Sequence, residues 1–106
     1  MQTLIDGTLL VTRASWRGRI FKAWGNRCAY CDAPAQSLDH VVPKATGGVT
    51  VATNMVPACL GCNRDKGHQE VLSWWRARHG WSAFREQRLR EWMGGHKKGA
   101  PEGPFP

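Results

Sequence analysis

The spacing of apolar positions predicts an amino-terminal hairpin followed by a helix. Residues 3–11, TLIDGTLLV, form two short β-prone runs around Asp6-Gly7, a dipeptide typical of two-residue hairpin turns. From residue 12 the period changes to that of an amphipathic helix, which Gly25 is expected to end. The apolar side chains that recur every four residues on its expected buried face are Trp16, Ile20 and Trp24.

The middle of the chain predicts two strands and the start of a helix. Residues 37–43 and 54–58 are short, apolar and partly β-branched, and the turn-rich stretch TGGVTVAT lies between them. We therefore expect two strands joined by a loop. A helix is expected to begin near Cys59 or Leu60 and to be interrupted at Gly67.

Two further helices are predicted before a tail. EVLSWWRARHG, residues 70–80, has apolar positions at helical spacing, and Ser82 is a plausible N-cap for a last helix that ends at Gly94-Gly95. That helix is expected to carry Phe84, Leu89, Trp92 and Met93. Residues 95–106, GHKKGAPEGPFP, have almost nothing to bury and predict a disordered tail, so residues 1–94 are expected to form a single domain.

The length of the chain indicates that this domain needs a metal or disulfides to stabilise it. A chain of 106 residues buries a limited fraction of its surface and often needs a metal or disulfides. The beginning, MQTLIDGTLLV, lacks the pattern of a secretory signal, and no apolar run approaches the ~20 residues of a membrane span. We therefore expect a cytoplasmic protein with reduced thiols and no membrane partner.

The cysteines form two CxxC pairs separated by 27 residues: Cys28 and Cys31, then Cys59 and Cys62. Two such pairs can present four sulfurs to one tetrahedral Zn²⁺, in a closed site that is structural. Two disulfides, with three possible connectivities, are the alternative. A thioredoxin-like redox pair is excluded because no βαβ pattern surrounds the cysteines. Zinc is the favoured interpretation, with an inserted element between the two pairs.

Charge adds a candidate partner. Fifteen Lys and Arg against eight Asp and Glu give a formal net charge of +7, and such an excess favours a polyanion such as a nucleic acid. Composition alone does not separate this from a merely soluble basic protein.

The insert carries polar residues suited to phosphodiester hydrolysis. Asp39 and Asn63 offer hard oxygen ligands of the kind that Mg²⁺ or Mn²⁺ prefers. His40 can act as a general base on a water molecule near neutral pH. On a regular strand, however, the neighbouring side chains of Asp39 and His40 point to opposite faces. Regular pairing is therefore expected to distort or end near these two residues.

At this point the order CAYC, LDHVVPKATGG and TNMVPACLGCNRDKG resembles the HNH endonuclease family in its zinc-stapled form, over residues 28–67. The resemblance implies an α+β fold in which two antiparallel strands and a helix surround the catalytic metal, as a ββα-metal core with the hairpin and the other helices flanking it. It also implies that Asp39 and Asn63 bind Mg²⁺ or Mn²⁺ and that His40 is the base. Asn54 would brace the loop that holds His40. Asn63 stands where many members have His, which favours Mg²⁺ or Mn²⁺ over softer metals.

The resemblance further implies a nuclease acting on double-stranded DNA, with products that carry 5′-phosphate and 3′-hydroxyl ends. Flanking phosphates are expected to contact Lys44, Arg64 and Lys66, with solvated surface charge as the alternative for each. The protein is expected to be a monomer or weak dimer. One active site per chain then implies that one DNA strand is nicked, unless two chains act together. Minimal members are often phage-encoded, which would place the protein in the host cytoplasm, in some cases beside the terminase.

Two other functions remain open from the sequence. A zinc-ribbon module that binds nucleic acid without cutting it shares the cysteines and the charge, but has no reason to keep Asp39, His40 and Asn63 in this order. The motif also does not exclude an RNase. Beyond the motif no separate recognition domain is predicted, so we expect weak sequence preference or dependence on a partner.

Overall fold

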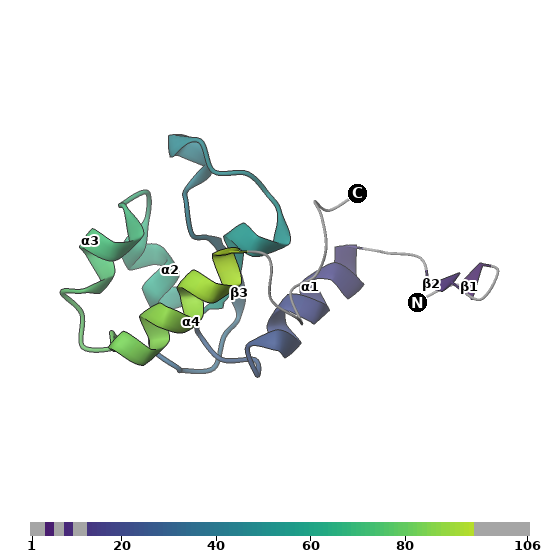
Figure 1. Cartoon of the computed structure of the whole chain (residues 1–106), viewed down its shortest axis with the longest axis horizontal. Coiled ribbons are helices and arrows are strands. Elements are labelled where there is room, and N and C mark those ends of the chain that lie inside the picture. Colours follow the sequence, from purple (N-terminus) through teal and green to yellow (C-terminus); the bar gives the residue numbers. More distant parts are fainter. Residues whose placement is uncertain (1–3, 6–7, 10–12, 95–106) are drawn as a thin grey trace.

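A computed structural model describes residues 4–5, 8–9 and 13–94 of the chain, and it is an α+β structure built from short elements (Figure 1). In chain order these are β1 (Leu4–Ile5), β2 (Thr8–Leu9), α1 (Arg13–Ala23), β3 (Ser37–His40), η1 (Lys44–Thr46), η2 (Ala52–Asn54), β4 (Met55–Ala58), α2 (Leu60–Lys66), α3 (Val71–Trp75) and α4 (Ala83–Gly94). The helices α1 and α4 are the longest elements. Within these described ranges, no helix is both long and apolar enough to cross a membrane.

The amino-terminal elements agree with the pattern of apolar positions. Strands β1 and β2 pair antiparallel, with Leu4 opposite Leu9 and Ile5 opposite Thr8. The predicted turn residues Asp6-Gly7 lie outside the described residues, as does the predicted tail 95–106. Helix α1 buries the predicted apolar side chains against β4 and the rest of the core: Trp16, Ile20 and Trp24.

Strands β3 and β4 form an antiparallel pair with a regular register, in which Asp39 lies opposite Val56 and His40 opposite Met55. The first strand is shorter than predicted and ends at His40. The side chain of Asn54 explains this end, because its Oδ1 accepts from the N–H of Val42 at 2.9 Å and its Nδ2 donates to the Val42 carbonyl at 3.1 Å. These side-chain bonds take the place of further strand pairing.

The carboxy-terminal half wraps helices around this pair. Helix α2 begins directly after Cys59 and ends before Gly67, as predicted, and Gly67 has a positive φ of 53°. Helix α3 is shorter than predicted and ends at Trp75, whose indole N–H donates to the carbonyl of Tyr30 at 2.9 Å. Beyond it the chain turns back so that a Cβ on Gly80 would lie 2.8 Å from the Cβ of Cys31. The return to the first cysteine pair therefore ends the helix early.

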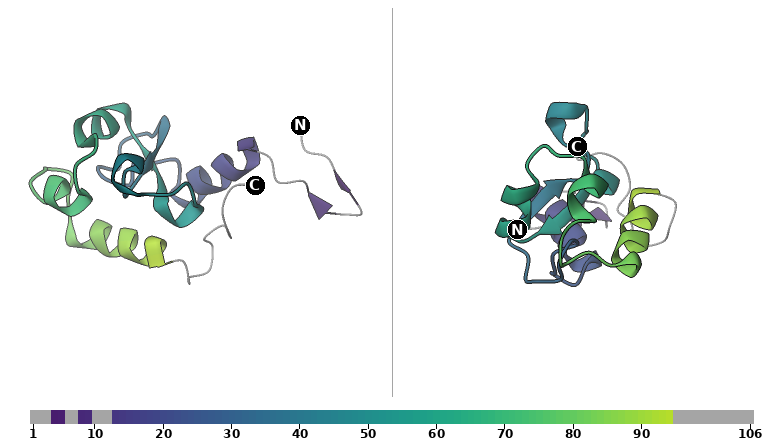
Figure 2. Two further views of the ribbon diagram at one scale, coloured as in Figure 1. Left: turned by 90° about the horizontal axis from the view of Figure 1, so that it is seen from above. Right: turned by 90° about the vertical axis from the view of Figure 1, so that its left-hand side faces the viewer.

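Helix α4 lies along the outer side of the fold in both views of Figure 2. Ser82 caps it as predicted, because its Oγ accepts from the N–H of Arg85 at 3.1 Å. The indole N–H of Trp92 donates to the carbonyls of Ala52 and Met55 and ties the helix to the end of the loop. Phe84, expected among the apolar positions of this helix, is 76% exposed, whereas Leu89 is buried.

Candidate functional site

The four cysteines converge on one point, although they come from two segments far apart in the sequence. Their Sγ atoms all lie within 4.8 Å of one another, and those of Cys31 and Cys59 are 3.7 Å apart. A disulfide would need about 2.05 Å, whereas four sulfurs at ~2.3 Å from a tetrahedral Zn²⁺ are separated by ~3.8 Å. The geometry therefore fits a tetrathiolate metal site, and all four cysteines are free thiols in the structure.

The cluster joins the first CxxC pair, Cys28 and Cys31, to helix α2, which carries Asn63. Cys59 is the N-cap of α2, and its Sγ accepts from the N–H of Cys62 at 3.3 Å. Burial raises the pKa of the Cys28 thiol to about 11. Buried thiolates at such short separations need a cation to stabilise them. A metal at this point therefore also fixes the start of α2.

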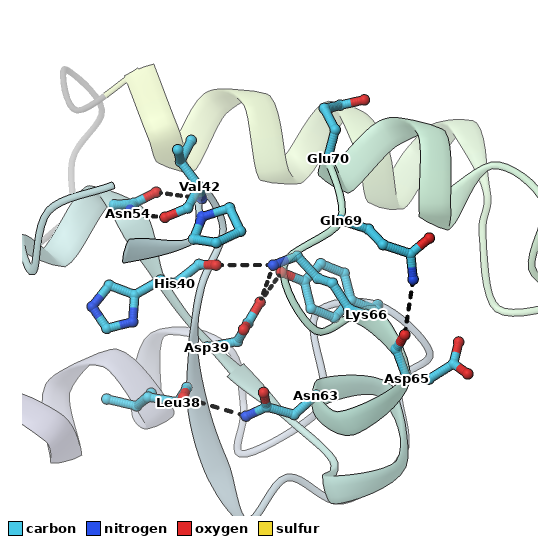
Figure 3. A network of polar contacts seen from close by, with 12 residues as sticks. Leu38, Asp39, His40, Val42, Asn54, Asn63, Asp65, Lys66, Gln69 and Glu70 are labelled. Carbon is cyan, nitrogen blue, oxygen red and sulfur yellow. Dashed lines mark hydrogen bonds and ion pairs between the residues drawn. The ribbon is translucent and has the colours of Figure 1, made fainter. Parts of the chain in front are cut away.

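Asp39 lies on the inner side of β3 and is 7% exposed (Figure 3). Its Oδ2 accepts from the Tyr30 hydroxyl at 2.7 Å and pairs with the Lys66 ammonium at 3.0 Å. Burial raises the pKa of Tyr30 well above its usual value, and the negative charge of Asp39 acts in the same direction, so the phenol stays a donor. Both contacts use Oδ2, and Oδ1 has no protein partner among the described residues.

Asn63 approaches the same side of β3 from α2. Its Nδ2 donates to the Ser37 hydroxyl at 2.9 Å, and Ser37 shares a strand face with Asp39. The longer contact of Nδ2 with the Leu38 carbonyl, 3.4 Å, holds the amide beside the strand (Figure 3). Asn63 Oδ1, like Asp39 Oδ1, is left without a protein partner in the described part of the chain. One carboxylate and one amide oxygen fit Mg²⁺ or Mn²⁺ in kind.

His40 lies on the other side of the strand. Its ring points away from Asp39 in Figure 3, as the regular register requires, and its Nε2 is 2.8 Å from the Thr50 hydroxyl. Burial lowers the pKa of His40 below its usual value, and the positive charge of Lys44 acts in the same direction. A neutral imidazole of this kind can accept a proton. The pairing ends at His40, as expected, but shows no distortion before that residue.

Asn54 braces the loop that follows β3. It is 6% exposed, and besides Val42 it donates from Nδ2 to the Val49 carbonyl at 3.0 Å. Lys66 adds a contact from the other side, since its ammonium donates to the carbonyl of His40 at 3.0 Å. The backbone at His40 and the loop after it are thus held by two residues distant in sequence.

Gly48 allows the loop to close on itself. A Cβ at this position would lie 1.7 Å from the carbonyl oxygen of Val42, which no small adjustment relieves. We expect Gly48→Ala to destabilise the protein by about 1–3 kcal/mol, because the overlap forces a backbone shift. Thermal unfolding followed by circular dichroism measures this.

Gly18→Ala is the matched control, because Gly18 lies in α1 and nothing lies within 4 Å of the Cβ it would gain. Its helix propensity predicts stabilisation of up to about 1 kcal/mol. Unfolding temperatures that rise equally in both variants would contradict the close approach of Gly48 to Val42.

The three predicted phosphate contacts differ in exposure. Lys44 and Arg64 are exposed, at the start of η1 and on α2. Lys66 is 0% exposed, and its ammonium contacts Asp39 and the His40 carbonyl. Its charge is therefore used inside the protein, in place of the phosphate contact expected from the sequence.

The sequence did not reveal three of these partners. The ring of Tyr30 contacts Trp74 and Trp75 edge-on, and its hydroxyl also donates to Asp39. Thr50 and Ser37 were assigned no role. Thr50 contacts His40 and Ser37 contacts Asn63 across ten or more positions of the chain. Contacts over such a separation produce no local sequence pattern, so the sequence could not identify these residues.

The match to known families covers this same segment. Residues 28–71 match the family model described as HNH endonuclease, which confirms the resemblance inferred from the sequence. The segment contains both cysteine pairs, β3, β4 and α2.

A curated relative is the CRISPR-associated endonuclease Cas9 of Corynebacterium diphtheriae, with 34% identity over 64 residues. The alignment covers 56% of this chain but 6% of that protein. The chain therefore corresponds to a small part of that protein.

Proposed function

We propose that the chain, whose residues 28–71 carry the HNH endonuclease segment, is a metal-dependent endonuclease that hydrolyses phosphodiester bonds in DNA. The observation that carries the proposal is the placement of His40 at the end of β3, with the free oxygens of Asp39 and Asn63 on the inner side of the same strand. The proposal requires that a phosphodiester lies across this strand end and contacts both sides of the strand.

His40 serves as the general base in this proposal. Its ring takes a proton from a water molecule at Nδ1 while Nε2 is held by Thr50. The water oxygen forms a bond to phosphorus, the bond from phosphorus to the 3′ oxygen breaks, and that oxygen takes a proton from solvent. The products then carry 5′-phosphate and 3′-hydroxyl ends. The Lys66 and Asn54 contacts keep the backbone of His40 and its loop in place during this transfer.

Two metals have separate roles. Zn²⁺ would be structural, bound by Cys28, Cys31, Cys59 and Cys62. Asp39 and Asn63 would hold Mg²⁺ or Mn²⁺, which when bound supplies positive charge to a non-bridging oxygen and the departing oxygen. Tyr30 and Lys66 keep the Asp39 carboxylate in one orientation through Oδ2.

The exposed charges support a nucleic-acid substrate, and we propose double-stranded DNA. Lys44 lies in the loop that carries Thr50, and Arg64 follows Asn63 on α2, so each lies within a few residues of a proposed active-site group. A formal net charge of +7 supports contacts with a polyanion. These contacts position the backbone of the substrate and carry no sequence preference.

Nicking of supercoiled plasmid in Mg²⁺ or Mn²⁺ tests the proposal. We expect His40→Ala to reduce the single-turnover rate by about 10²–10⁴-fold, because the base is lost. Mn²⁺ binding, followed by electron paramagnetic resonance, is expected to remain. Duplex RNA assayed in parallel separates a DNase from an RNase.

His79→Ala is the matched control, since His79 is an exposed histidine outside the matched segment. It is expected to cleave at the wild-type rate. Equal activity in His40→Ala and wild type would mean that a contaminating nuclease is responsible, and binding without cleavage by wild type would favour the zinc-ribbon module.

A further inference from the structure

The imidazole of His40 has a side-chain partner ten positions further along the chain. Its Nε2 lies 2.8 Å from the Oγ1 of Thr50, and this contact spans the loop between β3 and η2. The ring is partly buried, and Thr50 is exposed. A hydrogen bond at one ring nitrogen decides which tautomer is present and how the other nitrogen is directed.

The loop presents Thr50 at a fixed place. Asn54 binds the carbonyl of Val49, the residue directly before Thr50, at 3.0 Å. The same side chain binds both backbone groups of Val42, two residues after His40. One buried amide therefore holds the two ends of the loop segment that separates the imidazole from the hydroxyl.

The close approach of Gly48 to Val42 strengthens this constraint. The N–H of Gly48 donates to the carbonyl of Pro43 at 2.9 Å, and the chain passes so near Val42 that a side chain is excluded. Residues 42–49 therefore fold back on themselves. This brings the side chain of Thr50 to the His40 ring.

We propose that Thr50 is a positioning residue that orients the general base, an inference that rests on the proposed nuclease function. In its neutral form the His40 ring carries its proton on Nε2 and donates it to Thr50 Oγ1. Nδ1 then carries the lone pair, which accepts the proton of the attacking water. The imidazolium that results keeps the Nε2–H bond to Thr50, so the ring does not rotate during the transfer.

The alternative role of Thr50 is an ordinary surface threonine whose contact with His40 has no effect on the reaction. The two roles differ in whether the hydroxyl is needed for the reaction. The volume of the side chain is the same in both. Valine has the shape of threonine without the hydroxyl, and serine keeps the hydroxyl without the methyl group. This pair of variants therefore separates orientation of the ring from packing of the loop.

The experiment compares Thr50→Val and Thr50→Ser in plasmid nicking at saturating Mg²⁺. We expect the single-turnover rate of Thr50→Val to fall about tenfold, the equivalent of one neutral hydrogen bond, and that of Thr50→Ser to stay within about twofold of wild type. Mn²⁺ affinity and the unfolding temperature are expected to stay unchanged in both. Thr53→Val, on the neighbouring η2 turn, is the matched control and is expected to cleave like wild type.

A second readout does not depend on cleavage. The ¹⁵N chemical shifts of the His40 ring, measured at a pH where the ring is neutral, are expected to report the Nε2–H tautomer in wild type and Thr50→Ser and a mixture in Thr50→Val. Rates and tautomers that are the same in Thr50→Val and wild type would overturn the inference, as would a Thr50→Ser variant as slow as Thr50→Val. A wild-type protein that shows the tautomer effect but no cleavage would instead contradict the proposed function.

Discussion

Removing the metal from the four-cysteine cluster is expected to unfold the protein. The cluster connects the first CxxC pair to Cys59, the N-cap of α2. The segments that contain the two CxxC pairs are therefore both held by the metal. Structural zinc contributes ~10–16 kcal/mol in small domains, which matches or exceeds the ~5–15 kcal/mol of net stability that a domain has. Titration with a strong chelator, followed by tryptophan fluorescence and far-ultraviolet circular dichroism, measures the loss.

The zinc content of the same samples completes this test. One equivalent of zinc per chain is expected before chelation, and adding Zn²⁺ back is expected to restore the cooperative unfolding transition. Cys62→Ser is expected to resemble the chelated protein, since it removes one of the four ligands. Protein with less than half an equivalent of zinc and an unchanged transition would contradict a structural metal.

Removing the Asp39 carboxylate is expected to cost about 3–5 kcal/mol of folding free energy, because it leaves the Lys66 ammonium buried without its counter-charge. Lys66 is 0% exposed and lies 3.0 Å from Asp39 Oδ2, so no solvent replaces the lost partner. The free energy of unfolding of Asp39→Ala, measured by urea denaturation, checks this. The double variant Asp39→Ala/Lys66→Met is expected to recover much of the loss, since the charge is removed with its partner.

Lys22→Met is the matched control for the lysine substitution, because Lys22 is exposed on α1. Its effect on the free energy of unfolding is expected to be below about 0.5 kcal/mol. Additive effects of the Asp39 and Lys66 substitutions in the double variant would contradict the internal pair.

This pair also changes how the ligand role of Asp39 has to be tested. Loss of cleavage in Asp39→Ala alone does not separate a missing metal ligand from partial unfolding. Metal binding is therefore compared between the wild-type protein and the double variant, which lacks the Asp39 carboxylate but leaves no buried charge unpaired. Mn²⁺ binding by the wild type and none by the folded double variant is the result expected of a ligand, and equal binding in both would contradict that role.

Several elements were predictable because their causes are local. Helix α1 follows from the four-residue spacing of Trp16, Ile20 and Trp24, and its end from Gly25. The start of α2 at a cysteine and its end before Gly67 follow from capping and from a backbone conformation that favours glycine. The convergence of the cysteines could be predicted because CxxC spacing is itself a constraint imposed by metal geometry.

The sequence by itself determined which residue types the site contains and their order along the chain, from Asp39 and His40 to Asn54 and Asn63. Only the tertiary structure decided their partners. Packing of α2 across one face of β3 buries Lys66 against Asp39, and the loop braced by Asn54 brings Thr50 to His40 on the other side. The physical reason is that periodicity and capping act within a few residues, whereas a buried charge or an imidazole takes whichever partner the packed elements bring within hydrogen-bonding distance.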